Sequence, residues 1–123
     1  MTAASKSVYY FGLYLYLTGI TLIFIPNLFL STLGLPETHE VWIRVVGVLA
    51  MVIGFYYHRS AVKNNKEFFK LTVTARTFVF VSFILFVIFK MVPTILILIG
   101  LIDFLGAMWT RTALKINEND ILS

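Results

Sequence analysis

Hydrophobic residues fall into four long runs along the 123-residue chain, separated by short polar stretches. The runs cover roughly residues 8–25, 41–57, 71–89 and 94–109. Each has about 16–20 residues, close to the roughly 20 that an α-helix needs to cross a bilayer. Lipid cannot hydrogen-bond exposed backbone groups, and the runs lack the alternation of barrel strands. The pattern therefore predicts an all-α membrane protein, a single domain of four transmembrane helices in an up-down-up-down bundle.

Composition supports lipid as the solvent. The chain is 59% hydrophobic and 13% charged, whereas soluble domains carry about 25% charged residues. A soluble chain this short would have too little interior to bury so much apolar surface. The chain has no cysteine and two histidines, His39 and His58, which lie on opposite sides of the predicted membrane. We therefore expect no disulfide, no metal site and no thiol catalysis.

The distribution of basic residues predicts the orientation. The loop at 30–40 carries Glu37 and Glu40 and no lysine or arginine, whereas the segment 58–70 carries four basic residues. Lys6 precedes the first run, and Arg111 and Lys115 follow the last. The positive-inside rule then places both termini in the cytoplasm, with the protein spanning the inner (plasma) membrane several times.

This topology accounts for the net charge of +4 without a nucleic-acid partner. The expected partners are membrane lipid and either a second copy of the chain or another membrane protein. The stretch 26–36 is apolar but too short to span, so we interpret it as a loop or a short interfacial helix on the outer side. Aromatic residues favour membrane interfaces, and several lie near the predicted inner one: Tyr9, Tyr10, Tyr56, Tyr57 and Trp109.

Asp103 lies within the apolar run GLIDFLGAMW. It is about nine residues into its segment, or roughly 13 Å deep at 1.5 Å per residue, and a carboxylate near mid-bilayer costs roughly 2.5–3.5 kcal/mol. Small residues allow helices to approach closely in membranes. They predominate on the helix face of Asp103, which carries Ile99, Gly100, Gly106, Ala107 and Thr110. The opposite face carries Leu98, Leu101, Leu105 and Met108. The pattern predicts that Asp103 points into the bundle.

Three residues are candidate partners of Asp103. Tyr16 lies at a similar depth, while Arg44 and Arg76 lie toward the outer and inner sides of it. Asp103, Arg44, Arg76 and Tyr16 thus form a candidate intramembrane polar site. Two simpler alternatives stay open, because Arg44 follows Glu40 by four residues and Arg76 can extend to the inner headgroups. Whether the site is functional or structural is also open.

Glycines recur at a spacing of seven in two of the predicted helices. Gly12 and Gly19 lie in the first, and Gly47 and Gly54 in the second. This spacing repeats one helix face, and glycine lets two backbones come close. The pattern favours close packing of the first helix against another helix.

Three stretches carry a resemblance to known proteins: LPETHEVWIRVVGVLAMVIGFYY, TVTARTFVF and GLIDFLGAMWTRTAL. They resemble the DoxX-like and BphX-like families of small bacterial four-helix membrane proteins, over the second to fourth helices. Some DoxX relatives are similar to subunits of quinone-linked redox complexes, so the resemblance implies an accessory role in electron transport as one option. No catalytic residue is carried over.

No phosphate-binding glycine loop, HExxH or Gly-x-Ser-x-Gly motif is present in the sequence. Our first hypothesis is a non-enzymatic accessory subunit or homo-oligomer without a cofactor. The alternatives are a proton- or cation-coupled transporter or channel that uses Asp103, and a quinone- or lipid-linked redox accessory protein. A wet cavity at Asp103 would favour the transporter, and a dry, fully paired Asp103 would favour the accessory protein.

Overall fold

The computed structural model describes residues 2–122, the last six of them by their backbone alone. Over this range the chain forms five α-helices and no strand. They are α1 (Ala3–Phe24), α2 (Pro26–Thr32), α3 (Trp42–Val62), α4 (Lys66–Ile88) and α5 (Leu96–Leu122). All except the short α2 are long and apolar enough to cross a membrane. The predicted all-helical class with four candidate spans is therefore confirmed.

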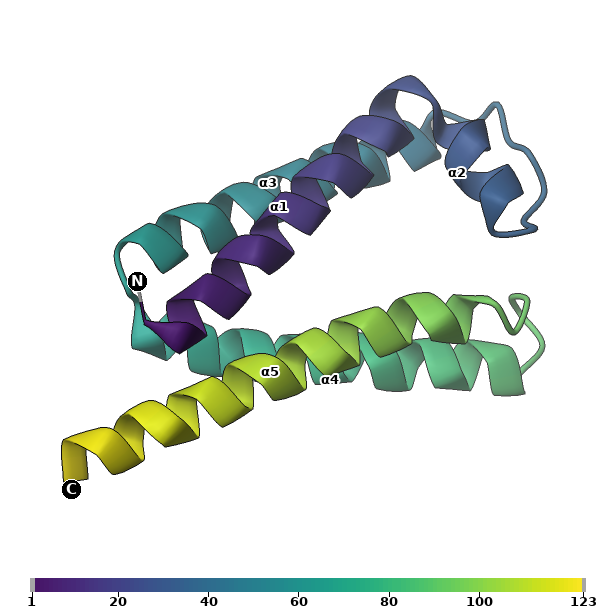
Figure 1. Ribbon diagram of the computed structural model, residues 1–123. Coiled ribbons are helices and arrows are strands. Elements are labelled where there is room, and N and C mark those ends of the chain that lie inside the picture. The colour runs from purple at the N-terminus through teal and green to yellow at the C-terminus, as the bar shows by residue number, and fades with distance from the viewer. Residues whose placement is uncertain (1, 123) are drawn as a thin grey trace.

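The long helices form two antiparallel hairpins (Figure 1). In one, α2 connects α1 to α3, and in the other a turn connects α4 to α5. The start of α1, the turn between α3 and α4, and the end of α5 lie at the same end of the molecule (Figure 1). The hairpins meet there and diverge toward α2. Since α1 packs against α3, α5 and α4, it is the central helix.

The helices continue past the apolar runs that predict them. α1 and α4 begin five residues earlier than expected, and α3 ends five residues later. Side chains cap the two early starts: Thr2 Oγ1 accepts from the Ser5 amide at 3.1 Å, and Asn65 Oδ1 accepts from the Phe68 amide at 3.2 Å. An apolar run reflects the thickness of the lipid, whereas a helix ends where its last backbone groups are capped.

The stretch 26–36 contains a helix, one of the two predicted options. Pro26 stands in its first turn, where a missing amide hydrogen is harmless. Gly34 follows its end with a φ of +73°, a conformation that glycine adopts at little cost. Pro26 and Leu30 are buried, so α2 closes the connection between α1 and α3.

Glycine pairs bring α1 and α3 into backbone contact, as their spacing predicts. A Cβ atom added to Gly19 would lie 2.7 Å from the carbonyl oxygen of Gly47, and one added to Gly47 would lie 2.8 Å from that of Gly19. Gly12 and Gly54 face one another in the same way, at 3.2 and 3.0 Å. A larger residue at Gly19 or Gly47 would overlap the facing backbone, whereas Gly12 and Gly54 leave slightly more room.

The hydrophobic core gathers at the end where the hairpins meet. Its buried members come from all four long helices: Ala4, Val8, Phe11, Tyr57, Ala61, Phe69, Ala113 and Leu114. This packing joins the two hairpins at one end. The space between them, farther along, contains the candidate site.

A candidate polar cavity between the hairpins

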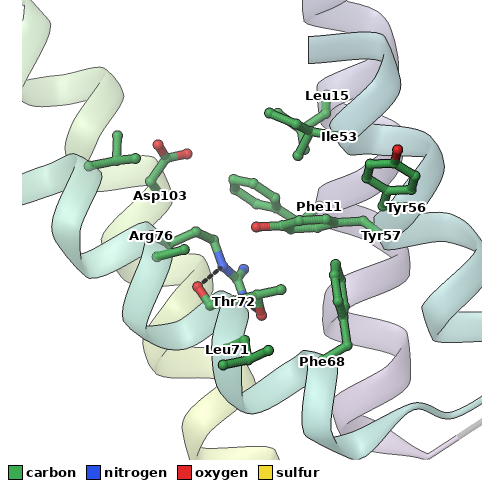
Figure 2. A pocket seen from close by; sticks show the side chains of 12 residues that line it. Phe11, Leu15, Ile53, Tyr56, Tyr57, Phe68, Leu71, Thr72, Arg76 and Asp103 are labelled. Carbon is green, nitrogen blue, oxygen red and sulfur yellow. Dashed lines mark hydrogen bonds between the residues drawn. The ribbon is translucent and has the colours of Figure 1, made fainter. Parts of the chain in front are cut away.

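A cavity of about 380 Å³ lies between the two hairpins, and all four long helices line it. Figure 2 shows the side chains of α1 and α3 on one side and those of α4 and α5 on the other. Most of the lining is apolar or aromatic: Phe11, Leu15, Ile53, Tyr56, Tyr57, Phe68, Leu71, Ala75 and Val79. The remaining lining residues are Thr72, Arg76 and Asp103. The cavity is therefore apolar with one polar wall.

Arg76 is the most deeply buried charge of that wall, with 2% of its surface exposed. Its Nη2 donates to Thr110 Oγ1 at 2.8 Å and to Thr72 Oγ1 at 3.0 Å, and its Nε donates to the Thr72 carbonyl oxygen at 3.3 Å. These bonds hold the guanidinium inside the protein. The alternative in which Arg76 extends to the headgroups is therefore wrong, because buried hydroxyls on α4 and α5 supply its acceptors.

Aromatic rings cover the guanidinium on the side of α1 and α3. Its Cζ lies 4.7 Å from the ring centroid of Phe11 and 5.7 Å from that of Tyr57, which are cation–π distances. Figure 2 shows the Tyr57 hydroxyl directed toward Arg76. Tyr57 is 6% exposed, so its ring is buried within the protein. The convergence of the hairpins at this end places its ring inside.

One nitrogen of Arg76, Nη1, is buried and has no hydrogen-bond partner. Gly106 leaves the space beside it, since a Cβ on Gly106 would lie 3.1 Å from Nη1. A guanidinium has five N–H donors, and a buried charged donor without an acceptor is costly. This nitrogen is therefore an unsatisfied donor next to the polar wall of the cavity.

Asp103 lies on the same wall of the cavity and is half-buried. Figure 2 shows its carboxylate directed into the cavity. The opposite face of α5 carries Leu98 and Leu105, which are 55% and 58% exposed, whereas Ala107 and Thr110 are fully buried. The small-residue face of α5 is thus turned inward, as the sequence predicts.

Asp103 and Arg76 share the cavity without a direct bond. None of the hydrogen bonds that hold Arg76 involves Asp103, and Nη1 has no partner. Both side chains nevertheless line the same cavity. Asp103 is therefore neither fully paired nor isolated.

The other two predicted site residues lie elsewhere. The hydroxyl of Tyr16 is 3.3 Å from His58 Nδ1. Arg44 donates from Nη1 to the carbonyl oxygen of Ile23, at the far end of α1. Both residues take part in contacts between α1 and α3, whereas Asp103 lies in the other hairpin. Of the four predicted site residues, the structure brings together Asp103 and Arg76.

Two hydroxyl residues outside the cavity lining, Thr110 and Ser7, extend the hydrogen-bond network of Arg76, and the sequence does not predict either as its partner. Thr110 accepts from Arg76, and its Oγ1 lies 2.7 Å from Ser7 Oγ on α1. The Arg76 network therefore connects α4 and α5 to α1. One member of this network, Thr72, could be predicted from the sequence. It precedes Arg76 by four residues and therefore lies on the same helix face. The pairing of Ser7 with Thr110, 103 residues apart, has no local signature.

The described part of the chain holds no group of three or more His, Asp or Glu residues arranged to bind a metal ion. His58 contacts Tyr16 and Tyr9, the latter edge-on at 5.4 Å between ring centroids. No family model, curated protein or solved structure matches the chain. The DoxX-like resemblance therefore stays a prediction.

Proposed function

We propose that this is a non-enzymatic accessory protein of the inner (plasma) membrane, acting as a subunit or a homo-oligomer, that holds a membrane-soluble molecule in the cavity. The observation that carries the proposal is the buried, unpartnered Nη1 of Arg76 beside a largely apolar cavity. A ligand with a carbonyl oxygen and an apolar body fits both features. The oxygen would accept a hydrogen bond from Nη1, and the apolar body would pack against the cavity walls. Esters of membrane lipids and quinones share this chemistry.

The size and lining of the cavity support binding. Its volume of about 380 Å³ falls within the roughly 300–1,000 Å³ typical of ligand sites. Aromatic and aliphatic walls hold an apolar body, and a few polar groups orient it. Among its described lining residues the cavity has one carboxylate and no histidine. This composition favours holding a molecule over transforming it.

The test uses photoactivatable probes and the purified protein in detergent. A diazirine-bearing methyl palmitate should label cavity peptides more strongly than the matching alkane, which lacks the carbonyl group. Ala75→Phe fills the cavity and should reduce labelling by the ester several-fold. Val81→Phe, at an exposed position of α4 outside the cavity, is the control and should leave labelling unchanged. Equal labelling by both probes in all variants would contradict the proposal.

A second candidate function follows from Asp103. Its carboxylate reaches the cavity and is not hydrogen-bonded to Arg76, so a proton or cation could occupy it. In proteoliposomes with a trapped pH-sensitive dye, a transporter would dissipate an imposed pH gradient. Asp103→Asn would abolish that flux. Wild-type protein that carries no flux above empty liposomes excludes this candidate and leaves the binding proposal standing.

The proposed orientation has both termini in the cytoplasm. Basic residues support it, because most lie near the start of α1, around the turn between α3 and α4, or in the C-terminal half of α5: Lys6, Arg59, Lys63, Lys66, Lys70, Arg111 and Lys115. The chain has no cysteine, so single cysteines give an unambiguous readout. An impermeant thiol reagent should label Ser31→Cys from the periplasmic side and Glu67→Cys from the cytoplasmic side. Labelling of both from one side would refute the topology.

A further inference from the structure

A second binding feature lies on the surface between α4 and α5, away from the cavity. A hollow of about 240 Å³ is lined by three basic side chains, Lys70, Arg111 and Lys115, together with Val73 and Leu114. Arg111 and Lys115 are exposed and four residues apart on α5. Like charges at this spacing repel one another. An anion placed between them would relieve the repulsion.

A larger hollow of about 490 Å³ continues from the first. It shares Val73 and Arg111 with the basic hollow. Its remaining lining residues lie farther along α4 and back along α5: Thr74, Thr77, Phe104 and Met108. These positions lead from the basic end of the α4–α5 hairpin toward its apolar middle. Together the two hollows form a groove with a cationic end and a largely apolar body.

We propose that this groove binds an anionic membrane phospholipid, with the phosphate between Lys70, Arg111 and Lys115 and an acyl chain along Phe104 and Met108. Basic pockets between transmembrane helices at the membrane surface are suited to lipid phosphates. A free phosphate ion would use the cationic end but not the groove beyond it. The site is independent of the cavity, because it lies on the other face of α4 and shares no lining residue with it.

The experiment measures lipid binding to the full chain in a nonionic detergent by native mass spectrometry, which counts bound lipids independently of stability. Phosphatidylglycerol should bind in preference to phosphatidylcholine with the same chains. Arg111→Gln should weaken the binding of phosphatidylglycerol about five-fold, as expected for one basic residue near a lipid phosphate. Combined with Lys70→Gln and Lys115→Gln, the loss should reach about a hundred-fold.

Two controls separate the site from the general charge of the protein. Arg59→Gln with Lys63→Gln removes two exposed basic residues of the same end that lie outside the hollow, and should leave the affinity within two-fold. Thr74→Trp, at an exposed groove position, should weaken the binding of phosphatidylglycerol while leaving the basic residues in place. Three results would overturn the proposal: no preference between the two lipids, an equal loss in the Arg59 and Lys63 control, or displacement of the lipid by millimolar inorganic phosphate.

Discussion

The two hairpins are built on different kinds of contact. In the hairpin of α1 and α3, glycines face backbone, and a Cβ on Gly19 would lie 2.7 Å from a carbonyl oxygen. In the hairpin of α4 and α5, Gly100 faces rings, and its Cβ would lie 3.0 and 3.1 Å from atoms of Phe83 and Phe80. A ring can turn aside, whereas a helix backbone moves only as a unit. The first hairpin is therefore fixed in its spacing, and the second can adjust.

A glycine-to-alanine substitution in each hairpin tests whether the two helix contacts differ in how easily they adjust. Gly19→Ala should destabilise the protein by about 2–3 kcal/mol, the upper part of the usual range for overpacking, because backbone and Met51 both block the new methyl group. Unfolding by SDS in mixed micelles provides the measurement. A loss below about 0.5 kcal/mol would mean that the α1–α3 contact adjusts as easily as the other hairpin.

The hydroxyl network that joins the hairpins gives the second largest effect. Thr110→Val keeps the shape of the side chain and removes the acceptor of Arg76 and the contact with Ser7. We expect a loss of about 2 kcal/mol, as for a hydrogen bond to a charged group. The control is Thr112→Val at an exposed position of α5, which should be nearly neutral in the same assay. Equal effects of the two changes would remove the network as the link between the hairpins.

The coupling between Asp103 and Arg76 should have a smaller effect on stability. A cycle of Asp103→Asn, Arg76→Met and the double variant should give a coupling energy of about 1 kcal/mol. Breaking a directly bonded buried pair costs about 3–5 kcal/mol, but no hydrogen bond joins these side chains. The measurement is the unfolding free energy of the wild type, the two single variants and the double variant. Strictly additive effects would favour Asp103 as an independent ion site.

Gly100→Ala should have the smallest effect, within about 0.5 kcal/mol. Moving the rings of Phe80 and Phe83 is unfavourable, but alanine favours a helix over glycine by about 1 kcal/mol. Gly19→Ala and Gly100→Ala add the same methyl group, so the difference between their effects reports how easily each helix contact adjusts. A loss as large as that of Gly19→Ala would show that the α4–α5 hairpin is also fixed.

The sequence predicts the helices better than their ends. Hydrophobic runs locate α1, α3, α4 and α5 because the thickness of a bilayer imposes a minimum length on them. The caps at Thr2 and Asn65 escape notice because both lie outside the apolar runs, in polar segments that carry no hydrophobic periodicity.

The site was predictable in part for a similar reason. Asp103 and Arg76 stand out because a charge is costly inside a membrane. Their surroundings do not stand out, because Ser7 and Thr110 become partners only when α1 packs against α5. Tyr57 follows an ordinary interfacial pattern in the sequence, and the meeting of the hairpins buries it. Long-range packing, rather than local composition, determines these positions.

The order of these contacts along the chain has a consequence for biosynthesis. The glycine contacts between α1 and α3 need no residue beyond His58, so this hairpin can close before α4 has been synthesised. Arg76 enters the membrane with one intrahelical partner, Thr72. Thr110 reaches it only after α5 has followed. The emergence of α5 therefore completes the burial of the charge, and a chain truncated before Thr110 would leave that charge without its shortest hydrogen bond, at 2.8 Å.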